Sequence, residues 1–197
     1  MAFIGLKYFG VALLSTEGTL SAAPTYTDGK IIGKAIRANL TINRNDNPLY
    51  ADDAVAEDDN SITGLNLEFG IDRLDEADRV KYSGGYKVTG SSGSPDLYYE
   101  TDAPAPYIGN GYIRVLMVDN VKKYQAVFMY KATMSQNNEE TNTKGENVDW
   151  QTPTLNIRGI AVPNFAQGSG NLFRVKAEFT TEAAALAWLK GQLGISN

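Results

Sequence analysis

Five carboxylates between positions 52 and 59 form the densest group of side chains that could do chemistry. They are Asp52, Asp53, Glu57, Asp58 and Asp59. A calcium loop is disfavoured, because its ligand spacing would place Ile62 at the third ligand position counted from Asp58. A catalytic carboxylate pair would lack partner chemistry nearby. A solvated loop, or a loop that faces a partner, accounts for the cluster without further requirements.

The chain of 197 residues contains no histidine and no cysteine. The commonest general base and the commonest metal ligand are therefore absent, as are disulfides and thiolate metal sites. Carboxylates, lysines and tyrosines remain available, but we expect a protein that is not an enzyme and that carries no metal or other cofactor. Gly168 and Gly170 begin like a dinucleotide-binding fingerprint, yet a third glycine is missing and a strand follows, which favours a plain turn.

The charge balance argues against a nucleic-acid-binding protein. The formal net charge is −5 and the isoelectric point is about 4.8. Such proteins usually present a basic face that neutralises phosphates, and the sequence suggests none. This excludes tight DNA binding but permits a channel to which DNA does not adhere. No stretch is long and apolar enough to span a membrane, and the apolar run Val11–Leu14 is too short for a signal peptide.

Alternating apolar and polar residues predict two strands that each bury one face. The segments are Ile36–Ile42 and Leu65–Ile71, in which every second residue is apolar. The polar residues between them would share the opposite face of each strand. They are Arg37, Asn39 and Thr41 in the first segment, and Asn66 and Glu68 in the second.

Longer apolar runs predict strands that are buried on both faces. Tyr112–Val118 and Tyr124–Met134 flank Asp119-Asn120, which indicates a hairpin. Their uniform apolarity favours a core on one side and a partner on the other. The segments Leu155–Val162 and Leu172–Phe179 look like a second pair of strands.

Two segments have helical signals. Asp72–Lys81 has acids early and bases late, which suits the helix dipole. Thr181 can cap a C-terminal helix over Glu182–Leu193, and Gly194 can end it. We expect this helix to pack across a sheet face through one apolar stripe. The stripe contains Leu186, Leu189 and Leu193, with Ala185 and Trp188 beside them.

Three long segments without an apolar period predict loops: Asn43–Ser61, Ser83–Ala105 and Ser135–Gln151. Loops of this length are uncommon in a small domain unless they are functional or disordered. We therefore expect neighbouring subunits to order them. The tract Asn137–Lys144 is either a flexible surface loop or a segment that orders on contact with another subunit. Nothing indicates a second domain, so the expected organisation is one mainly β domain over residues 1–197.

Several stretches together carry a family resemblance. They are Ile42–Asp53 with Ala56–Asp59, Asn137–Gly145, Gln151–Leu155, and Ala187-Trp188-Leu189 in the terminal helix. In content, order and spacing they resemble phage major tail proteins of the phi13 type, which build the tail tube of long-tailed, non-contractile phages. The segment Lys81–Pro106 contributes little to the resemblance.

The resemblance implies a β-sandwich or barrel-like tail-tube fold flanked by a helix, without an additional C-terminal immunoglobulin-like module. In that family, copies form rings, typically hexameric, whose inner sheets join into one barrel. The rings stack into a tube around a tape-measure protein, with tail terminator and distal tail proteins as further partners. DNA later passes through without specific binding. The expected location is the virion tail, assembled in the host cytoplasm, and no membrane is involved.

Site residues follow from the same expectations. Contacts between subunits or rings are expected at Asn43, Arg44, Asp46, Tyr50, Asp52, Asp53, Glu57, Asp58, Asp59, Glu139, Glu140 and Lys144. Residues facing the lumen are expected at Asn39, Thr41, Asn66 and Glu68. With Arg37 beside Glu68, these would form a hydrated, mildly negative wall. The same faces could equally be the outer surface, because alternation does not say which face is wet from inside.

Two other functions remain open at the level of the sequence. The protein could be a different virion component, such as a tail-tip or head-completion protein. It could also be a carbohydrate-binding β-sandwich whose sugar platform contains Tyr98, Tyr99, Tyr107 and Tyr112. Nothing in the spacing of these tyrosines requires a platform, and core or interface positions suit them better.

Overall fold

The computed structural model describes residues 2–51, 54–91, 93–136 and 152–195, with the backbone alone for residues 47–51, 54–58 and 136. The chain is mainly β, as predicted. Its strands are β1 (Ala2–Thr16), β2 (Thr25–Ile31), β3 (Ala35–Arg44), β4 (Asn47–Ala51), β5 (Ala54–Asp59), β6 (Ile62–Ile71), β7 (Tyr86–Val88), β8 (Leu97–Tyr99), β9 (Ile108–Val118), β10 (Val121–Gln136), β11 (Thr154–Gly159), β12 (Val162–Pro163), β13 (Asn171–Leu172) and β14 (Arg174–Phe179). Its helices are α1 (Glu76–Ser83) and α2 (Glu182–Gln192).

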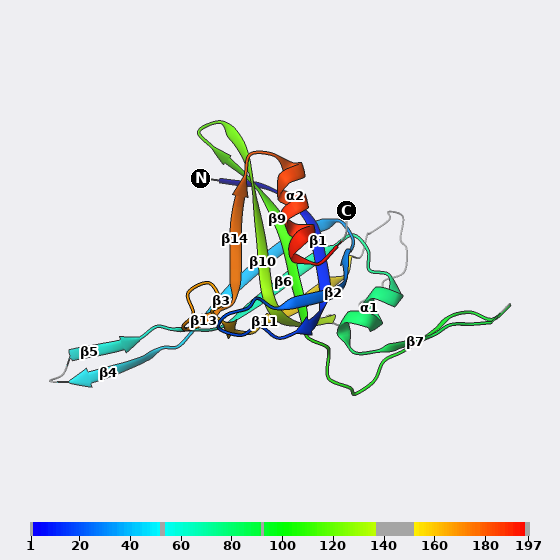
Figure 1. The fold of residues 1–197 in the computed structure, drawn as a ribbon, viewed down its shortest axis with the longest axis horizontal. Helices are drawn as coiled ribbons and strands as arrows, with labels where there is room; N and C mark the ends of the chain where they lie inside the picture. The colour runs from blue at the N-terminus through cyan, green and yellow to red at the C-terminus, as the bar shows by residue number, and fades with distance from the viewer. Residues whose placement is uncertain (1, 52–53, 92, 137–151, 196–197) are drawn as a thin grey trace, which may run out of the picture.

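One antiparallel sheet of eight strands organises the molecule, in the order β2-β1-β9-β10-β11-β6-β3 with β14 also paired to β10 (Figure 1). The long strand β10 divides the sheet, because Tyr124–Met129 pairs with β14 and Ala132–Gln136 pairs with β11. The pairing of β10 with β9 is irregular between Met129 and Ala132. At this irregularity the strand passes from one part of the sheet to the other.

The two parts of the sheet fold over one core, which makes the fold sandwich-like. Phe9 on β1 stacks on Phe69 of β6 with ring centres 4.5 Å apart, and Phe69 contacts Tyr112 of β9 at 5.5 Å. Alternate residues of β6 and β11 are buried beneath them, including Leu67 and Ile157. The predicted one-sided burial of Leu65–Ile71 is therefore confirmed.

The β9–β10 hairpin forms as the sequence predicts. Asp119 and Asn120 both have positive φ, 49° and 62°, the conformation of a two-residue turn that matches the twist of the strands. Both faces of the hairpin are buried at Ala126–Met129, but within this chain the second cover is α2, whereas we expected a partner. The predicted pairing of Leu155–Val162 with Leu172–Phe179 is wrong in its main part, because β11 and β14 both pair with β10 instead.

Helix α2 covers the outer face of β9, β10 and β14. Thr181 caps it by accepting a hydrogen bond from the Ala184 amide at 3.3 Å, as predicted. Leu189 and Leu193 are fully buried, and they lie over Gly111 and Gly10. These two glycines are cross-strand partners, so the sheet has a shallow depression where the helix rests. A Cβ on Gly111 would lie 2.6 Å from Leu189 Cδ1, which explains why no side chain stands there.

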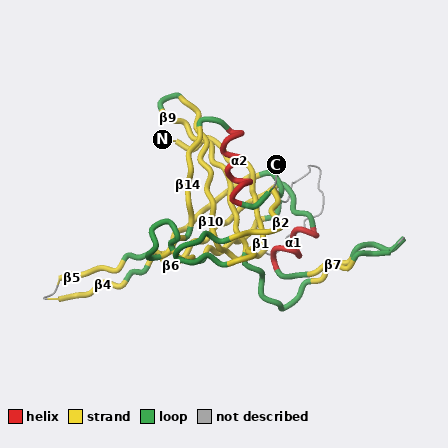
Figure 2. The backbone as a smooth tube through the Cα atoms, viewed as in Figure 1, coloured by secondary structure: helices red, strands yellow, loops and turns green. Residues whose placement is uncertain are grey.

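Two of the predicted loops are instead hairpin arms. Most of Asn43–Ser61 forms strands β4 and β5 with their flanks, and Ser83–Ala105 contains β7 and β8. Figures 1 and 2 show both arms leaving the body. An arm that leaves the body has no face turned to the core, so its sequence need not show an apolar period. Most of the third predicted loop, Ser135–Gln151, lies outside the described residues, but β10 extends to Gln136 and shortens it.

Candidate functional site: a polar sheet face and two arms

One outer face of the sheet is polar across four strands, and neither of the two described helices lies on it. It contains Asn39 and Thr41 of β3, Asn66 and Glu68 of β6, Asn156 and Arg158 of β11, and Thr133 and Ser135 of β10. We call these eight residues the polar face. The strand register aligns them in two rows: Asn39, Glu68, Asn156 and Ser135, then Thr41, Asn66, Arg158 and Thr133. All four residues predicted to face a lumen thus lie together.

The polar face is not negative, contrary to our expectation. Arg37 lies 3.9 Å from Glu68 and both side chains are exposed, so the predicted pairing is confirmed. Arg158, which the sequence analysis overlooked, adds an exposed cation one row away. The face and its neighbour Arg37 therefore carry one carboxylate against two arginines. The alternation Leu155, Asn156, Ile157, Arg158 was the signal that could have placed this arginine.

Two of the predicted contact residues hold the base of the β4–β5 arm. Arg44 Nη1 donates a hydrogen bond to the carbonyl oxygen of Asn60 at 2.9 Å. Asn45 Nδ2 donates to Asp59 Oδ2 at 2.7 Å, and the Ser61 amide donates to Asp59 Oδ1 at 3.1 Å. These two hydrogen bonds, that from Asn45 first, lower the pKa of Asp59. The arm therefore has a fixed base.

Of the remaining predicted contact residues, some lie within the described part of the chain and the rest do not. Asn43 is half-buried near the end of β3, and Asp46 is exposed just before β4. Tyr50, Glu57 and Asp58 are placed on the arm by the backbone of β4 and β5. The others lie outside the described residues: Asp52, Asp53, Glu139, Glu140 and Lys144.

The β7–β8 arm presents an apolar face that sequence reasoning missed. Tyr86 pairs with Tyr99, and Val88 pairs with Leu97, so all four side chains share one face. The two tyrosine rings stack with centres 4.9 Å apart. Their exposures are 51%, 45%, 47% and 40% in sequence order, although all are large and hydrophobic. Lys87 lies on the opposite face, 2.6 Å from Asp96.

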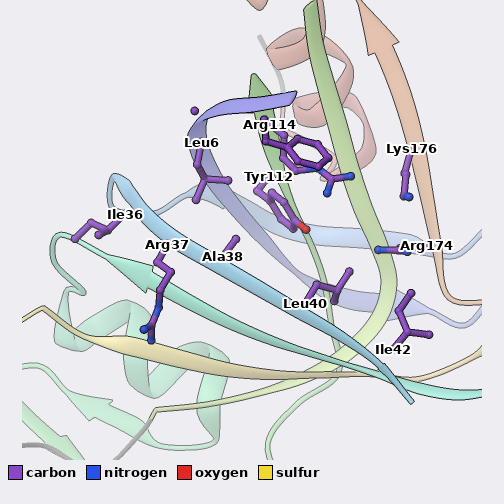
Figure 3. Close-up of a pocket in the computed structure, with 12 residues that line it drawn as sticks. Leu6, Ile36, Arg37, Ala38, Leu40, Ile42, Tyr112, Arg114, Arg174 and Lys176 are labelled. Atoms are coloured by element: carbon purple, nitrogen blue, oxygen red, sulfur yellow. The ribbon is translucent and has the colours of Figure 1, made fainter. Parts of the chain in front are cut away.

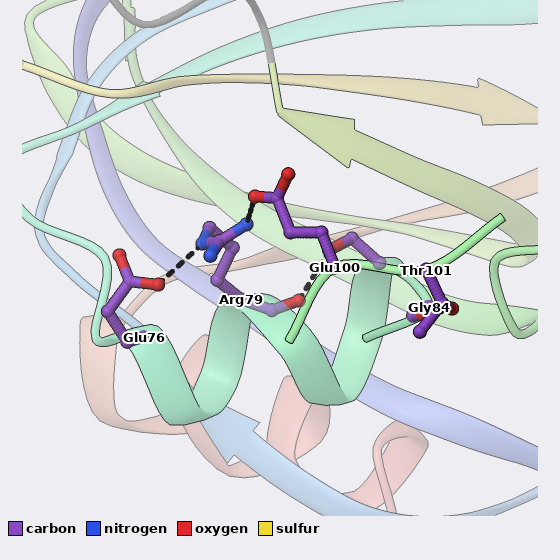
Figure 4. A network of polar contacts seen from close by, with 6 residues as sticks. Glu76, Arg79, Gly84, Glu100 and Thr101 are labelled. Carbon is purple, nitrogen blue, oxygen red and sulfur yellow. Dashed lines mark hydrogen bonds and ion pairs between the residues drawn. The ribbon is translucent and has the colours of Figure 1, made fainter. Parts of the chain in front are cut away.

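Helix α1 anchors the base of this second arm (Figure 4). Arg79 Nε donates to Glu76 Oε2 at 2.7 Å, and its Nη1 binds Glu100, which follows β8. The Thr101 hydroxyl donates to the carbonyl oxygen of Gly84 at 2.8 Å. Gly84 ends the helix with a φ of 102°. The helix begins after Asp75, later than predicted, and leads directly into β7.

The tyrosines considered for a sugar platform do not come together. Tyr112 is 2% exposed inside the core, and Tyr107 lies under Lys131 Nζ, 4.1 Å from its ring centre. Tyr98 and Tyr99 are neighbours on β8, so their side chains point to opposite faces of the arm. The four rings therefore offer no common surface.

Helix α2 places its predicted packing residues unequally. Leu189 and Leu193 are buried at the centre, together with Ala185. Leu186 and Trp188 are only half-buried at the margin of the interface. Trp188 lies beside Phe179 of β14, with ring centres 6.1 Å apart.

Comparison with known proteins assigns the chain to no family. No family model matches it, and the search of curated proteins finds no match. Within the described residues, no group of three or more carboxylates could hold a metal ion. In the same part of the chain, no helix is long and apolar enough to cross a membrane.

Proposed function

We propose that this protein is a structural subunit that assembles with copies of itself into the tube of a long, non-contractile phage tail. The observation that carries the proposal is the apolar face of the β7–β8 arm. An isolated two-stranded hairpin is marginally stable in water. A projecting hairpin that exposes four large hydrophobic side chains is therefore best explained by a partner that covers them.

Free strand edges favour the same function. Within the described part of the chain, β3 pairs only with β6, and β14 pairs only with β10. Each leaves one edge with unpaired backbone groups, which invites another strand. Pairing between copies would satisfy these groups and extend the sheet around a ring. The hexameric ring implied by the family resemblance is part of the proposal.

The polar face suits the wall of a channel for DNA. Small amides and hydroxyls hydrate the wall, and the sparse, mixed charges give neither strong attraction nor strong repulsion of phosphates. DNA could then slide without deep binding sites. In this proposal the tape-measure protein occupies the channel before DNA does, and terminator and distal tail proteins bind the tube ends in the virion.

Electron microscopy of the concentrated, purified chain tests the proposal. We expect open-ended tubes of constant diameter. Closed rings without tubes would indicate a different virion component, and a chain that stays monomeric at every concentration would refute self-assembly. The wild type should also show slower amide exchange in residues 43–61 and 135–151 after assembly than before it.

Arm variants identify the interface that drives assembly. Replacing Tyr86, Val88, Leu97 and Tyr99 with serine should abolish tubes while the far-ultraviolet circular dichroism of the body is retained. Lys87→Ser, on the opposite face of the same arm, is the matched control and should still form tubes. Unimpaired assembly of the four-serine variant would show that this face is not the contact.

A further inference from the structure

A groove opens at the side of the sandwich and is lined by residues of β1, β3, β9 and β14 (Figure 3). Its volume is about 520 Å³. One wall is apolar and includes Leu6, Leu40 and Ile42. The other wall carries three cations on β9 and β14, Arg114, Arg174 and Lys176, and Arg37 of β3, which pairs with Glu68, also lines the groove. We call this the cationic groove.

In the part of the chain that the structure describes, the three cations on β9 and β14 form no ion pair. Among the described residues, no carboxylate lies within ion-pair distance of Arg174 or Lys176. Arg114 donates to the Gln125 side chain and lies 4.4 Å from the ring centre of Phe3, but its buried Nε has no partner. The nearby Glu178 accepts a hydrogen bond from Gln125 Nε2 at 2.9 Å.

Both cations on β14 have a lowered pKa. Partial burial lowers the pKa of Arg174, and the charge of Arg114 adds to the effect. Partial burial also lowers the pKa of Lys176, followed by repulsion from Arg174 and Arg114. The carboxylates of a ligand would offset the repulsion among these three partly desolvated cations. Apolar side chains on the same ligand would cover the apolar wall.

We propose that the cationic groove binds the acidic β4–β5 arm of a second copy of this chain. This inference rests on the proposed self-assembly and names one of its contacts. From Asn47 to Asp59 the sequence has five carboxylates and no lysine or arginine, together with Leu49, Tyr50 and Val55. Charge and apolarity of the arm thus complement both walls of the groove.

The direction of the arm makes this a contact between different copies. The groove is lined by residues of β3 that include Ala38, Leu40 and Ile42, and the same strand leads into β4 beyond Arg44. Figure 1 shows the β4–β5 arm continuing away from the body. An arm that leaves its own groove behind can reach the groove of a neighbour. Such a head-to-tail contact generates rings or open filaments, in accordance with a tube.

A nucleic acid is a weaker occupant for this groove. A phosphate backbone would meet the cations, but it offers nothing for the apolar wall of Leu6, Leu40 and Ile42. The five carboxylates of the arm on the same chain would also repel it. Binding of DNA in place of the arm would therefore refute the proposal.

Charge reversal with rescue tests the contact in the full-length chain. Arg174→Glu/Lys176→Glu should raise the protein concentration needed for assembly by about tenfold or more, because every groove would repel every arm. Glu57→Lys/Asp58→Lys in the arm should do the same. A chain that carries all four substitutions should regain assembly. Lys122→Glu/Lys123→Glu, with the same change of net charge at the start of β10, should leave assembly unchanged.

Disulfide trapping gives a second readout, because the chain has no cysteine of its own. Copies with Ala38→Cys in the groove are mixed with copies with Ala54→Cys in the arm, assembled and mildly oxidised. We expect cross-linked dimers, and far fewer when Ala54→Cys is paired with Ala103→Cys at an exposed site elsewhere. Circular dichroism and thermal unfolding confirm that each variant is folded.

The outcomes separate this inference from the proposed function. Tubes that form without the 38–54 cross-link, or that tolerate Arg174→Glu/Lys176→Glu, overturn the groove–arm contact and leave the tube function standing. A wild-type chain that never assembles overturns both. If a short DNA duplex binds the wild type, binding is lost in Arg174→Glu/Lys176→Glu, and the fourfold variant does not regain assembly, the groove binds polyanions and the proposal is wrong.

Discussion

The outer face of β10 is covered by α2 in the first half of the strand and is bare in the second half. In its first half, Ala126 and Phe128 point outward and are fully buried under α2. In its second half, Thr133 and Ser135 point outward as part of the polar face, and neither described helix covers them. The irregular pairing between Met129 and Ala132 shifts the alternation by one residue, so the same strand serves both faces.

This difference separates stability from assembly. Helix α2 shields the apolar side chains of the covered half from water, so substitutions that weaken this contact should destabilise the fold. The bare half already satisfies its outer side chains with water, so changes there should leave the fold intact and alter contacts with other molecules. Four predictions test this division, in order of decreasing effect on stability.

Leu189→Ala should have the largest effect. Leu189 is fully buried between α2 and the sheet. Its truncation leaves a cavity over Gly111, which has no side chain that could fill it. We expect a loss of about 2–5 kcal/mol in the free energy of unfolding, measured by urea denaturation. Trp188→Ala should cost less, about 1–2 kcal/mol, because the indole is only half-buried at the margin. A larger cost for Trp188 would mean that the margin, not the centre, holds the helix.

Gly111→Ala tests the depression itself. The added Cβ would meet Leu189 Cδ1 and the carbonyl oxygen of Val127, each at 2.6 Å, and the backbone atom cannot move away easily. We expect a loss of about 1–3 kcal/mol from overpacking, measured by thermal unfolding. Gly191→Ala controls for crowding, because an added Cβ there would meet no neighbouring atom within 4 Å and the backbone has no positive φ. Equal, minor losses at both sites would show that the helix does not rest in the depression.

The start of α2 should give a pH-dependent contribution. Lys7 Nζ and the Tyr8 hydroxyl both bind Glu182, at 2.7 and 2.8 Å, and these hydrogen bonds, in that order, lower the pKa of Glu182. A carboxyl group with a lowered pKa stabilises the fold above its unfolded value, and the contribution disappears as the pH falls through the folded value. Glu182→Gln should therefore be less stable than wild type at pH ~7 and approach it below pH ~4.

Parallel denaturation curves at several pH values measure this effect. The difference in unfolding free energy between the two proteins should shrink as the pH falls. A difference that is constant across the range would show that the contacts of Glu182 do not depend on its charge.

Much of the body could be predicted from the sequence because its signals are local. Alternation in Leu65–Ile71, the Asp119-Asn120 turn and the Thr181 cap each depend on neighbours along the chain, and all three predictions are confirmed. The partners of β14 could not be predicted in this way. Its pairing depends on where β10 changes its alternation, and no local rule marks that position.

The candidate site was less predictable because exposed structure carries little pattern. The β7–β8 arm has only three residues in each strand, too few to show a period, so it was taken for a loop. The cationic groove joins Arg114 to Arg174 and Lys176 across strands that are far apart in sequence. By contrast, the four residues expected to face the lumen do share one face, because side chains alternate along a strand and the sequence shows that alternation directly.

Glu68→Lys is the change expected to affect stability least, and it decides the role of the bare half. The pair with Arg37 spans 3.9 Å between exposed side chains, so losing it should cost less than about 1 kcal/mol. The substitution replaces one carboxylate against two arginines with three cations on the polar face. On a channel wall, the resulting rings of cations would attract DNA and slow or block its ejection from assembled particles, while tubes still form. Glu68→Gln, which removes the charge without adding a cation, should eject DNA nearly normally. Ejection that is the same for lysine and glutamine would place Glu68 outside the channel. A bulky maleimide then gives an independent answer, because Glu68→Cys in intact tubes reacts readily on an outer surface and slowly on an enclosed wall.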